Sequence, residues 1–304
     1  MKQGTLTLFA VLFSILNAFS KEKPKPEAEI DSAQIMMDAY EKGLTYQTGE
    51  VKIGDNLAKL KVPAGFKFLN AADAQKVVYE IWGNPRDKEE KMYGMLIPEK
   101  MKATGQDSWA FIIEYDDMGF VKDDDADKIN YAEMLKEMQD GEKEENAERV
   151  KAGFGAVHIV GWAEQPHYDK TRKVLHWAKE IDFDGTTEHT LNYNVRVLGR
   201  KGIIMLNAVG NISQLGEIKQ TIDGVLSSVE YNEGNRYSDF NPSVDKVAAW
   251  TIGGLVAGKV LAKVGILAMI AKFGKVIFLA IGGGAAAIWR FMKRATGRGG
   301  EEQA

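Results

Sequence analysis

Three alternating aspartates carry the clearest chemical signal in this chain, because they have the first spacings of a calcium-binding loop. They are Asp123, Asp125 and Asp127. The pattern then fails, since Lys128 stands where the loop needs Gly for its turn, and Met134 stands where a bidentate Glu closes the site. Residues 114–149 hold 14 Asp or Glu against 5 Lys or Arg. We therefore interpret the stretch as a solvated acidic loop and helix, and we predict no bound metal ion.

The four histidines are the other residues that could do chemistry. They are His158, His167, His176 and His189. No two are three to five residues apart, so no pair of metal ligands lies on one helix. The sequence also has no nucleophile elbow, no phosphate-binding loop and no dinucleotide fingerprint. No catalytic residue can be assigned, and we favour a non-enzymatic role. A hydrolase that uses dispersed Asp, Glu and His is an alternative.

The chain contains no Cys. Disulfide bonds, zinc–thiolate sites, thiol catalysis and a lipoprotein anchor on a leader cysteine are therefore all excluded. We expect no cofactor, and the folded part has to be stabilised by its core alone.

Aromatic residues and turn formers gather in what the sequence suggests is one connection. They comprise Gly161, Trp162, residues 166–169 (Pro-His-Tyr-Asp) and Trp177. One interpretation is a binding surface for a partner or ligand. The other, which we favour, is an aromatic core beside a loop.

The N-terminus has the order of a cleavable signal peptide. Lys2 precedes an apolar run over 6–19, and the small residues Ala18 and Ser20 occupy the positions that a signal peptidase reads. An uncleaved N-terminal anchor is the alternative. We predict a signal peptide over 1–20 and a charged linker over 21–31.

The C-terminal stretch is apolar and rich in small residues, and residues 246–298 carry nine Lys or Arg but no Asp or Glu. Residues 276–289 form an uncharged run flanked by Lys275 and Arg290, whose charges can extend toward the headgroups. We predict a transmembrane helix over 273–292. The positive-inside tendency would place the basic-then-polar tail 293–304 in the cytoplasm.

The segment 245–272 is also apolar, but Lys259 and Lys263 lie in it on one helical face. We predict an amphipathic helix at the membrane surface or a membrane helix. In the second case, the two helices form a hairpin. The small-xxx-small pair Gly254 and Gly258 permits close packing, within a hairpin or between protomers.

The remaining residues 32–240 suit one extracytoplasmic domain. We predict helices over 32–41, 71–82, 130–151 and 215–226, the second with Asn70 as its N-cap. We predict strands over 60–68, 93–97, 109–115, 156–162, 173–181, 190–198, 202–209 and 228–231. Alternating residues on both sides of the turn 199–202 indicate a β-hairpin. Clustered strands with helices between them indicate an α+β fold with a mainly antiparallel sheet.

Six short segments, in this order along the chain, resemble a known bacterial family. They are 119–126, 161–162, 166–169, 191–202, 234–240 and 253–259. They are similar to the membrane-anchored family classed as domain of unknown function 2167. The resemblance covers nearly the whole mature chain. It implies a bacterial, exported, membrane-anchored protein, and it implies no reaction.

The functional expectation is a membrane-anchored module of the cell envelope that binds a partner outside the cytoplasm. We expect membrane lipid as a partner of the tail, and a protein or small molecule as a partner of the domain, which would be periplasmic in a Gram-negative cell. We expect no nucleic-acid partner. A homo-oligomer assembled through the tail is the third alternative.

Overall fold

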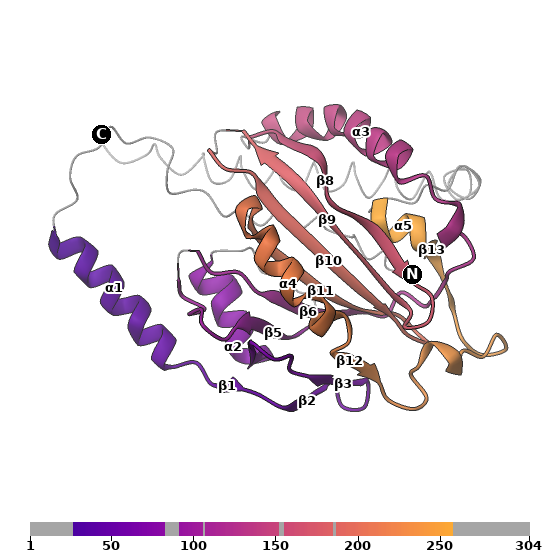
Figure 1. Cartoon of the computed structure of the whole chain (residues 1–304), viewed down its shortest axis with the longest axis horizontal. Coiled ribbons are helices and arrows are strands. Elements are labelled where there is room, and N and C mark those ends of the chain that lie inside the picture. Colours follow the sequence, from indigo (N-terminus) through magenta and orange to yellow (C-terminus); the bar gives the residue numbers. More distant parts are fainter. Residues whose placement is uncertain (1–26, 83–90, 106, 152–154, 185–186, 258–304) are drawn as a thin grey trace, which may run out of the picture. The chain divides into compact units, whose positions relative to one another are not determined.

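The computed structural model describes residues 27–82, 91–105, 107–151, 155–184 and 187–257 (Figure 1). All of them belong to one compact unit. The predicted signal peptide and the predicted transmembrane helix lie outside the described residues. Among the residues that are described, no helix is both long and apolar enough to cross a membrane.

An eight-stranded antiparallel sheet forms the centre of the domain, in the order β1-β4-β5-β6-β11-β10-β9-β8. Its strands are β1 (Tyr46–Gln47), β4 (Phe66–Asn70), β5 (Met92–Pro98), β6 (Phe111–Asp116), β8 (Val157–Asp169), β9 (Val174–Phe183), β10 (Thr190–Leu198) and β11 (Ile203–Asn211). The mainly antiparallel α+β prediction is confirmed, and so is the β10–β11 hairpin.

Two smaller sheets complete the strand inventory of the described residues. One joins β2 (Glu50–Ile53), β3 (Ala58–Lys61) and β12 (Val229–Tyr231) in antiparallel order. The other pairs β7 (Phe120–Lys122) with β13 (Val247–Thr251) in parallel. The predicted strand over 60–68 is thus two strands, because the turn at 62–65 separates β3 from β4.

The described residues contain five α-helices, of which α1 projects away from the sheet (Figure 1). They are α1 (Glu27–Lys42), α2 (Ala71–Gln75), α3 (Tyr131–Lys151), α4 (Leu215–Leu226) and α5 (Ile252–Ala257), and α2 continues as a π-helix over Lys76–Ile81. Short 3₁₀ turns lie at Ala126–Lys128, Ile212–Gln214 and Tyr237–Asp239. The N-cap prediction is confirmed, because the Asp73 amide donates to the Asn70 side chain at 3.0 Å.

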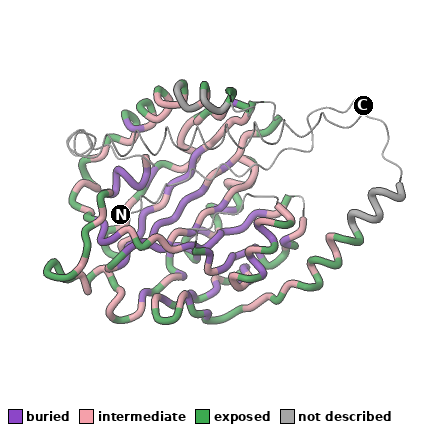
Figure 2. Tube along the Cα trace, turned by 180° about the vertical axis from the view of Figure 1, so that it is seen from behind, coloured by how far each residue is buried: buried purple, intermediate pink, exposed green. Residues whose placement is uncertain are grey.

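Both faces of the central sheet are covered, and buried residues concentrate in its central strands (Figure 2). On the α4 face, Tyr193 and Val195 of β10 join a core cluster with Ile222 of α4. On the opposite face, called the α3 face below, Leu198 of β10 joins a cluster with Met134 of α3 and residues of α5. Because successive side chains of a strand point to opposite faces of the sheet, the position along the strand determines which core cluster a side chain joins.

The structure differs from the sequence prediction over 245–272. Residues 247–251 form a strand, and the apolar residues of α5 are buried in the core cluster of the α3 face. The folded domain thus continues past 240 to 257, because β13 finds a non-local partner in β7. Residues 258–272 lie outside the described residues. At the other end, α1 begins at Glu27, so part of the expected linker 21–31 is helical.

The aromatic segment is not a connection between elements. Residues 161–169 belong to β8, which runs without interruption through Pro166. A proline is tolerated here because β8 is the edge strand and its pairing with β9 shifts register between Glu164 and His167. The predicted strand 156–162 is therefore too short, because the sequence interpretation took the proline and glycine in this stretch as turn formers.

Candidate functional site

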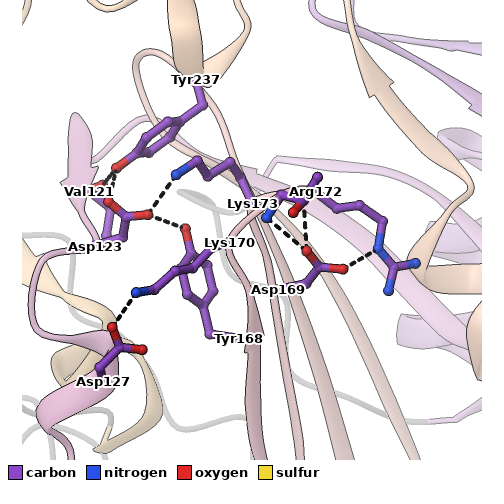
Figure 3. Close-up of polar contacts among 10 residues, drawn as sticks. Val121, Asp123, Asp127, Tyr168, Asp169, Lys170, Arg172, Lys173 and Tyr237 are labelled. Atoms are coloured by element: carbon purple, nitrogen blue, oxygen red, sulfur yellow. Dashed lines mark hydrogen bonds and ion pairs between the residues drawn. The ribbon is translucent and has the colours of Figure 1, made fainter.

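Four residues from three separate chain segments meet at the carboxylate of Asp123, directly after β7 (Figure 3). Tyr168 of β8 donates its hydroxyl proton to Asp123 Oδ2 at 2.7 Å, and the Lys173 ammonium donates to the same oxygen at 2.8 Å. The Tyr237 hydroxyl lies 3.1 Å from Asp123 Oδ1 and 2.9 Å from the Val121 carbonyl oxygen. We call Asp123, Tyr168, Lys173 and Tyr237 the Asp123 hub.

The β8–β9 turn positions Lys173 for this contact. Asp169 accepts hydrogen bonds from the Thr171 and Arg172 amides at 2.8 and 2.9 Å, and from Arg172 Nε at 2.6 Å (Figure 3). Lys173 then takes a positive φ of 58°, which is uncommon for a residue with a side chain. Its ammonium lies 4.7 Å from the Tyr237 ring centroid, so a cation–π contact adds to the ion pair.

The electrostatics of the hub fix its protonation at neutral pH. Burial acts to raise the pKa of Asp123, but hydrogen bonds from Lys173, Tyr168 and Tyr237 lower it below the usual value. Burial and the neighbouring carboxylate raise the pKa values of Tyr168 and Tyr237. Asp123 is therefore an ionised acceptor and both tyrosines are neutral donors. The hub stabilises the fold, and neither Asp123 nor the two tyrosines are poised to exchange protons near pH 7.

The other two aspartates of the alternating set turn toward different donors. Asp125 accepts the Ile252 and Gly253 amides at 3.2 and 3.0 Å, and so caps the start of α5. Asp127 forms an ion pair with Lys170. Within the part of the chain that the structure describes, no group of three or more His, Asp or Glu side chains is arranged to hold a metal ion.

Aromatic and ionic contacts extend the hub toward β13. Phe120 of β7 stacks on Phe240 with ring centroids 3.8 Å apart. Arg200 donates from Nε to Asp245 Oδ2 at 2.7 Å and from Nη1 to the Gly234 carbonyl at 3.1 Å. A pocket of about 390 Å³ lies beside this pair, lined by Asp117, Gly119, Arg200, Lys201, Val244, Asp245 and Lys246. The segments 119–126, 166–169, 198–202, 234–240 and 253–257 are thus brought together around β7, β13 and α5.

The histidines do not converge on one place. His167 and His176 face each other across β8 and β9 with ring centroids 5.6 Å apart. His176 is held by the Tyr193 hydroxyl at 3.0 Å, and burial lowers its pKa. His158 lies beside Glu142 of α3, and His189 pairs with Glu180 at 2.6 Å.

Sequence reasoning missed a row of buried polar side chains on the α3 face. Arg196 of β10 is only 8% exposed, and its guanidinium donates to the Asn207 side chain at 2.7 Å and to the Asn194 side chain at 3.1 Å. Asn207 in turn donates to Glu114 at 3.2 Å. The sequence shows that polar residues alternate with apolar ones in 191–198, but it does not show that both faces of this central strand are buried.

The aromatic residues of the predicted cluster serve the core. Trp177 is only 2% exposed and lies in the core cluster of the α3 face. Trp162 packs against the same cluster and donates its indole proton to the Tyr131 carbonyl at 3.0 Å. The aromatic-core interpretation is confirmed for these two side chains, within a strand rather than beside a loop.

Comparison with known proteins shows a family but no activity. Comparison with curated proteins gives no match. One similar solved structure is LpqN, described as involved in cell envelope biogenesis of Mycobacterium tuberculosis, with 12% identity, a TM-score of 0.32 and coverage of 64% of this chain and 96% of that chain. Another is cyanobacterial PsbP (CyanoP) from Synechocystis sp. PCC 6803, with 10% identity, a TM-score of 0.32 and coverage of 62% and 92%.

The match to a protein family is much more extensive. Residues 45–285 match the family described as "Protein of unknown function (DUF2167)". This range contains the Asp123 hub, both strands of the β7–β13 pair and the whole central sheet. The resemblance carried by the short sequence segments is therefore confirmed, and the chain belongs to the DUF2167 family.

Proposed function

We propose that this protein is a non-enzymatic binding module of the bacterial cell envelope, exported and held at the membrane by its C-terminal segment. The observation that carries the proposal is where the family-like segments meet. They gather at β13 and α5, the last described elements before the apolar tail. Asp125 caps α5, and the Asp123 hub holds Tyr237 against the carbonyl of Val121 in β7, the partner of β13. These contacts hold β13 and α5, the elements that precede the apolar tail in the sequence, to the rest of the described domain.

The carboxylates of this site support a structural role rather than hydrolysis. A catalytic acid or base needs a proton that it can exchange near the working pH. Asp123 instead accepts hydrogen bonds from three side chains, and its pKa is lowered despite partial burial. Asp125 is committed to two backbone amides. Carboxylates that accept hydrogen bonds in this way stabilise the fold. The binding surface of the domain therefore has to lie elsewhere.

The amino-acid sequence supports the membrane part of the proposal. Residues 276–289 are uncharged and apolar between Lys275 and Arg290, and the positive residues that follow favour a cytoplasmic C-terminus. The leader-like residues 1–20 support export of the domain. In a Gram-negative cell, the domain would then face the periplasm, with membrane lipid as the partner of the tail.

Alkaline carbonate washing of membranes tests the anchor. The full chain should stay in the membrane pellet, and a variant that lacks 273–292 should be released, because the removed run is the proposed span. A matched variant that lacks 293–304 should stay, since it keeps the apolar run. Release of the full chain, or retention of the variant without 273–292, would refute the anchor.

A further inference from the structure

Two hydrogen-bond donors on the α3 face of the sheet lack a matching acceptor or countercharge. The Trp177 indole nitrogen is buried and has no hydrogen-bond partner, and the residue is 2% exposed. Lys179 is 8% exposed, and no hydrogen bond or ion pair joins its ammonium to any other residue that the structure describes. Buried donors and charges of this kind are costly unless a partner satisfies them.

The strand pairing places these groups beside each other. Trp177 and Lys179 are two residues apart on β9 and so share the α3 face. Their neighbours on β10 are Asn194 opposite Trp177 and Asn192 opposite Lys179. The Arg196 guanidinium carbon lies 5.1 Å from the Trp177 ring centroid. On this face Lys179 therefore has Trp177 as its neighbour along β9 and Asn192 as its partner on β10, and Arg196 lies beyond Trp177, opposite Leu175.

The two buried cations on this face, Arg196 and Lys179, differ in how far neighbouring groups compensate their charge. Burial lowers the pKa of Arg196 to about 10, but this guanidinium has neutral acceptors in Asn194 and Asn207, and the carboxylates of Glu114 and Asp116 act to raise its pKa. Burial, and then repulsion from Arg196, also lower the pKa of Lys179 to about 8, and no carboxylate among the described residues offsets them. Its charge is the unbalanced one.

We propose that this place is a binding site for an oxyanion, a phosphate or carboxylate group of a ligand, between Lys179, Arg196 and the Trp177 indole. A single anionic group there would supply the countercharge of Lys179 and an acceptor for the indole N–H at once. Arg196 would add its positive field, and the side-chain NH₂ of Asn192, whose oxygen already accepts from Asn194, would orient the oxygens. The site gives the binding module proposed above a ligand class, and it rests on that proposal.

The test follows the Trp177 indole resonance by NMR and the thermal unfolding midpoint of the full chain in nonionic micelles. Inorganic phosphate is added against sodium chloride at equal ionic strength. It should shift the resonance, assigned with Trp177→Phe, and raise the midpoint by roughly 2–4 °C at several times its dissociation constant. A second arm adds phosphatidylglycerol to the micelles. A shift with the lipid alone would identify a headgroup as the source of the oxyanion, and a shift with both would identify any accessible phosphate.

Lys179→Met should abolish the response, because it removes the charge and keeps most of the length of the side chain. Lys201→Met is the matched control, because Lys201 is exposed and lies in the β10–β11 turn, and it should respond like the unmodified chain. Lys179→Gln replaces Lys179→Met if the latter does not fold. No shift in either arm, or an undiminished response in a folded Lys179 variant, would overturn the site. Neither result would alter the outcome of carbonate washing, so the two proposals fail separately.

Discussion

At the scale of single residues, aspartates whose spacing suggests a metal site instead stabilise the fold. Asp123, Asp125 and Asp127 alternate as the ligands of a calcium loop do, yet each accepts from a different donor in the folded chain. The sequence showed their spacing, but it could not show that Lys173 and Tyr237 arrive from distant segments to take up the lone pairs of Asp123. The sequence shows which residues can accept hydrogen bonds, but the tertiary fold determines which donors reach them.

The ionised state of Asp123 predicts a pH-dependent contribution to stability. Asp123→Asn should lower the free energy of unfolding by about 1–3 kcal/mol at pH 7, because it removes a charged acceptor from three donors. Since the folded-state pKa of Asp123 is lowered, its contribution is complete above the usual value near 3.9 and is lost as pH falls through the folded-state pKa.

Chemical denaturation at several pH values measures this difference. The gap between the unmodified chain and Asp123→Asn should close as the solution is acidified below about pH 4. Asp124→Asn is the matched control, because Asp124 is the exposed neighbour, and it should change little at any pH. A gap that is constant with pH would show that Asp123 does not act through its charge.

The glycine at the end of the β10–β11 turn is required by a close approach. A Cβ atom on Gly202 would lie 2.0 Å from the Asp116 carbonyl oxygen, so Gly202→Ala should lower the free energy of unfolding by about 1–3 kcal/mol. Gly216→Ala is the comparison, because Gly216 is in α4 with open space around it, and the change should raise stability by about 0.5–1 kcal/mol. Equal effects in thermal melts would contradict this account.

At the scale of elements, α3 protects the open edge of the central sheet. The free backbone groups of the edge strand β8 are satisfied by side chains of this helix: Asn146 accepts from the Val157 amide at 2.9 Å, and Gln139 donates to the Ile159 carbonyl at 2.8 Å. Glu142 accepts from the Ile159 amide at 2.6 Å. A charged helix thus takes the place of a neighbouring strand, which is one way that proteins prevent edge-to-edge association.

Removal of one of these contacts should open the edge locally. Asn146→Ala deletes both hydrogen bonds to Val157, so amide exchange at Val157 should accelerate, in line with a local loss of about 0.5–1.5 kcal/mol. Lys143→Ala changes an exposed residue of the same helix and should leave this amide unaffected. Hydrogen–deuterium exchange measures the protection of the Val157 amide in both variants. Unchanged protection of Val157 in Asn146→Ala would show that α3 does not hold the edge.

Elements with strong local signals were predictable, and those that depend on distant pairing were not. The α4 prediction matches Leu215–Leu226, because helical spacing alone defines it, and the β10–β11 hairpin follows from alternation around a turn. The small apolar residues of β13 and α5 looked like the start of a membrane segment. Only their parallel pairing with β7, more than 120 residues earlier, turns them into part of the domain. The polar row at Arg196 was missed because burial of both faces is a property of the whole sheet.

At the scale of the whole molecule, we propose that a folded domain is followed by a membrane anchor. The last described element is α5, whose apolar residues join a core cluster with Met134 of α3, and the apolar run 276–289 follows later in the sequence. The Asp125 cap lies at the start of α5, and the Asp123 hub lies directly after β7, the partner of β13. The central claim of the proposed function is topological: we propose that the domain lies outside the cytoplasm and that one span separates it from the C-terminus.

Single-cysteine labelling in intact cells tests this claim most directly, and it is clean because the chain has no native Cys. With an impermeant thiol reagent, Ser32→Cys should react and Ala304→Cys should be protected until the cells are lysed. Labelling at both positions would contradict the single span and support a hairpin that turns near Lys272 and Lys275. Protection of Ser32→Cys in intact cells, with labelling after lysis, would contradict export of the domain and with it the proposed function.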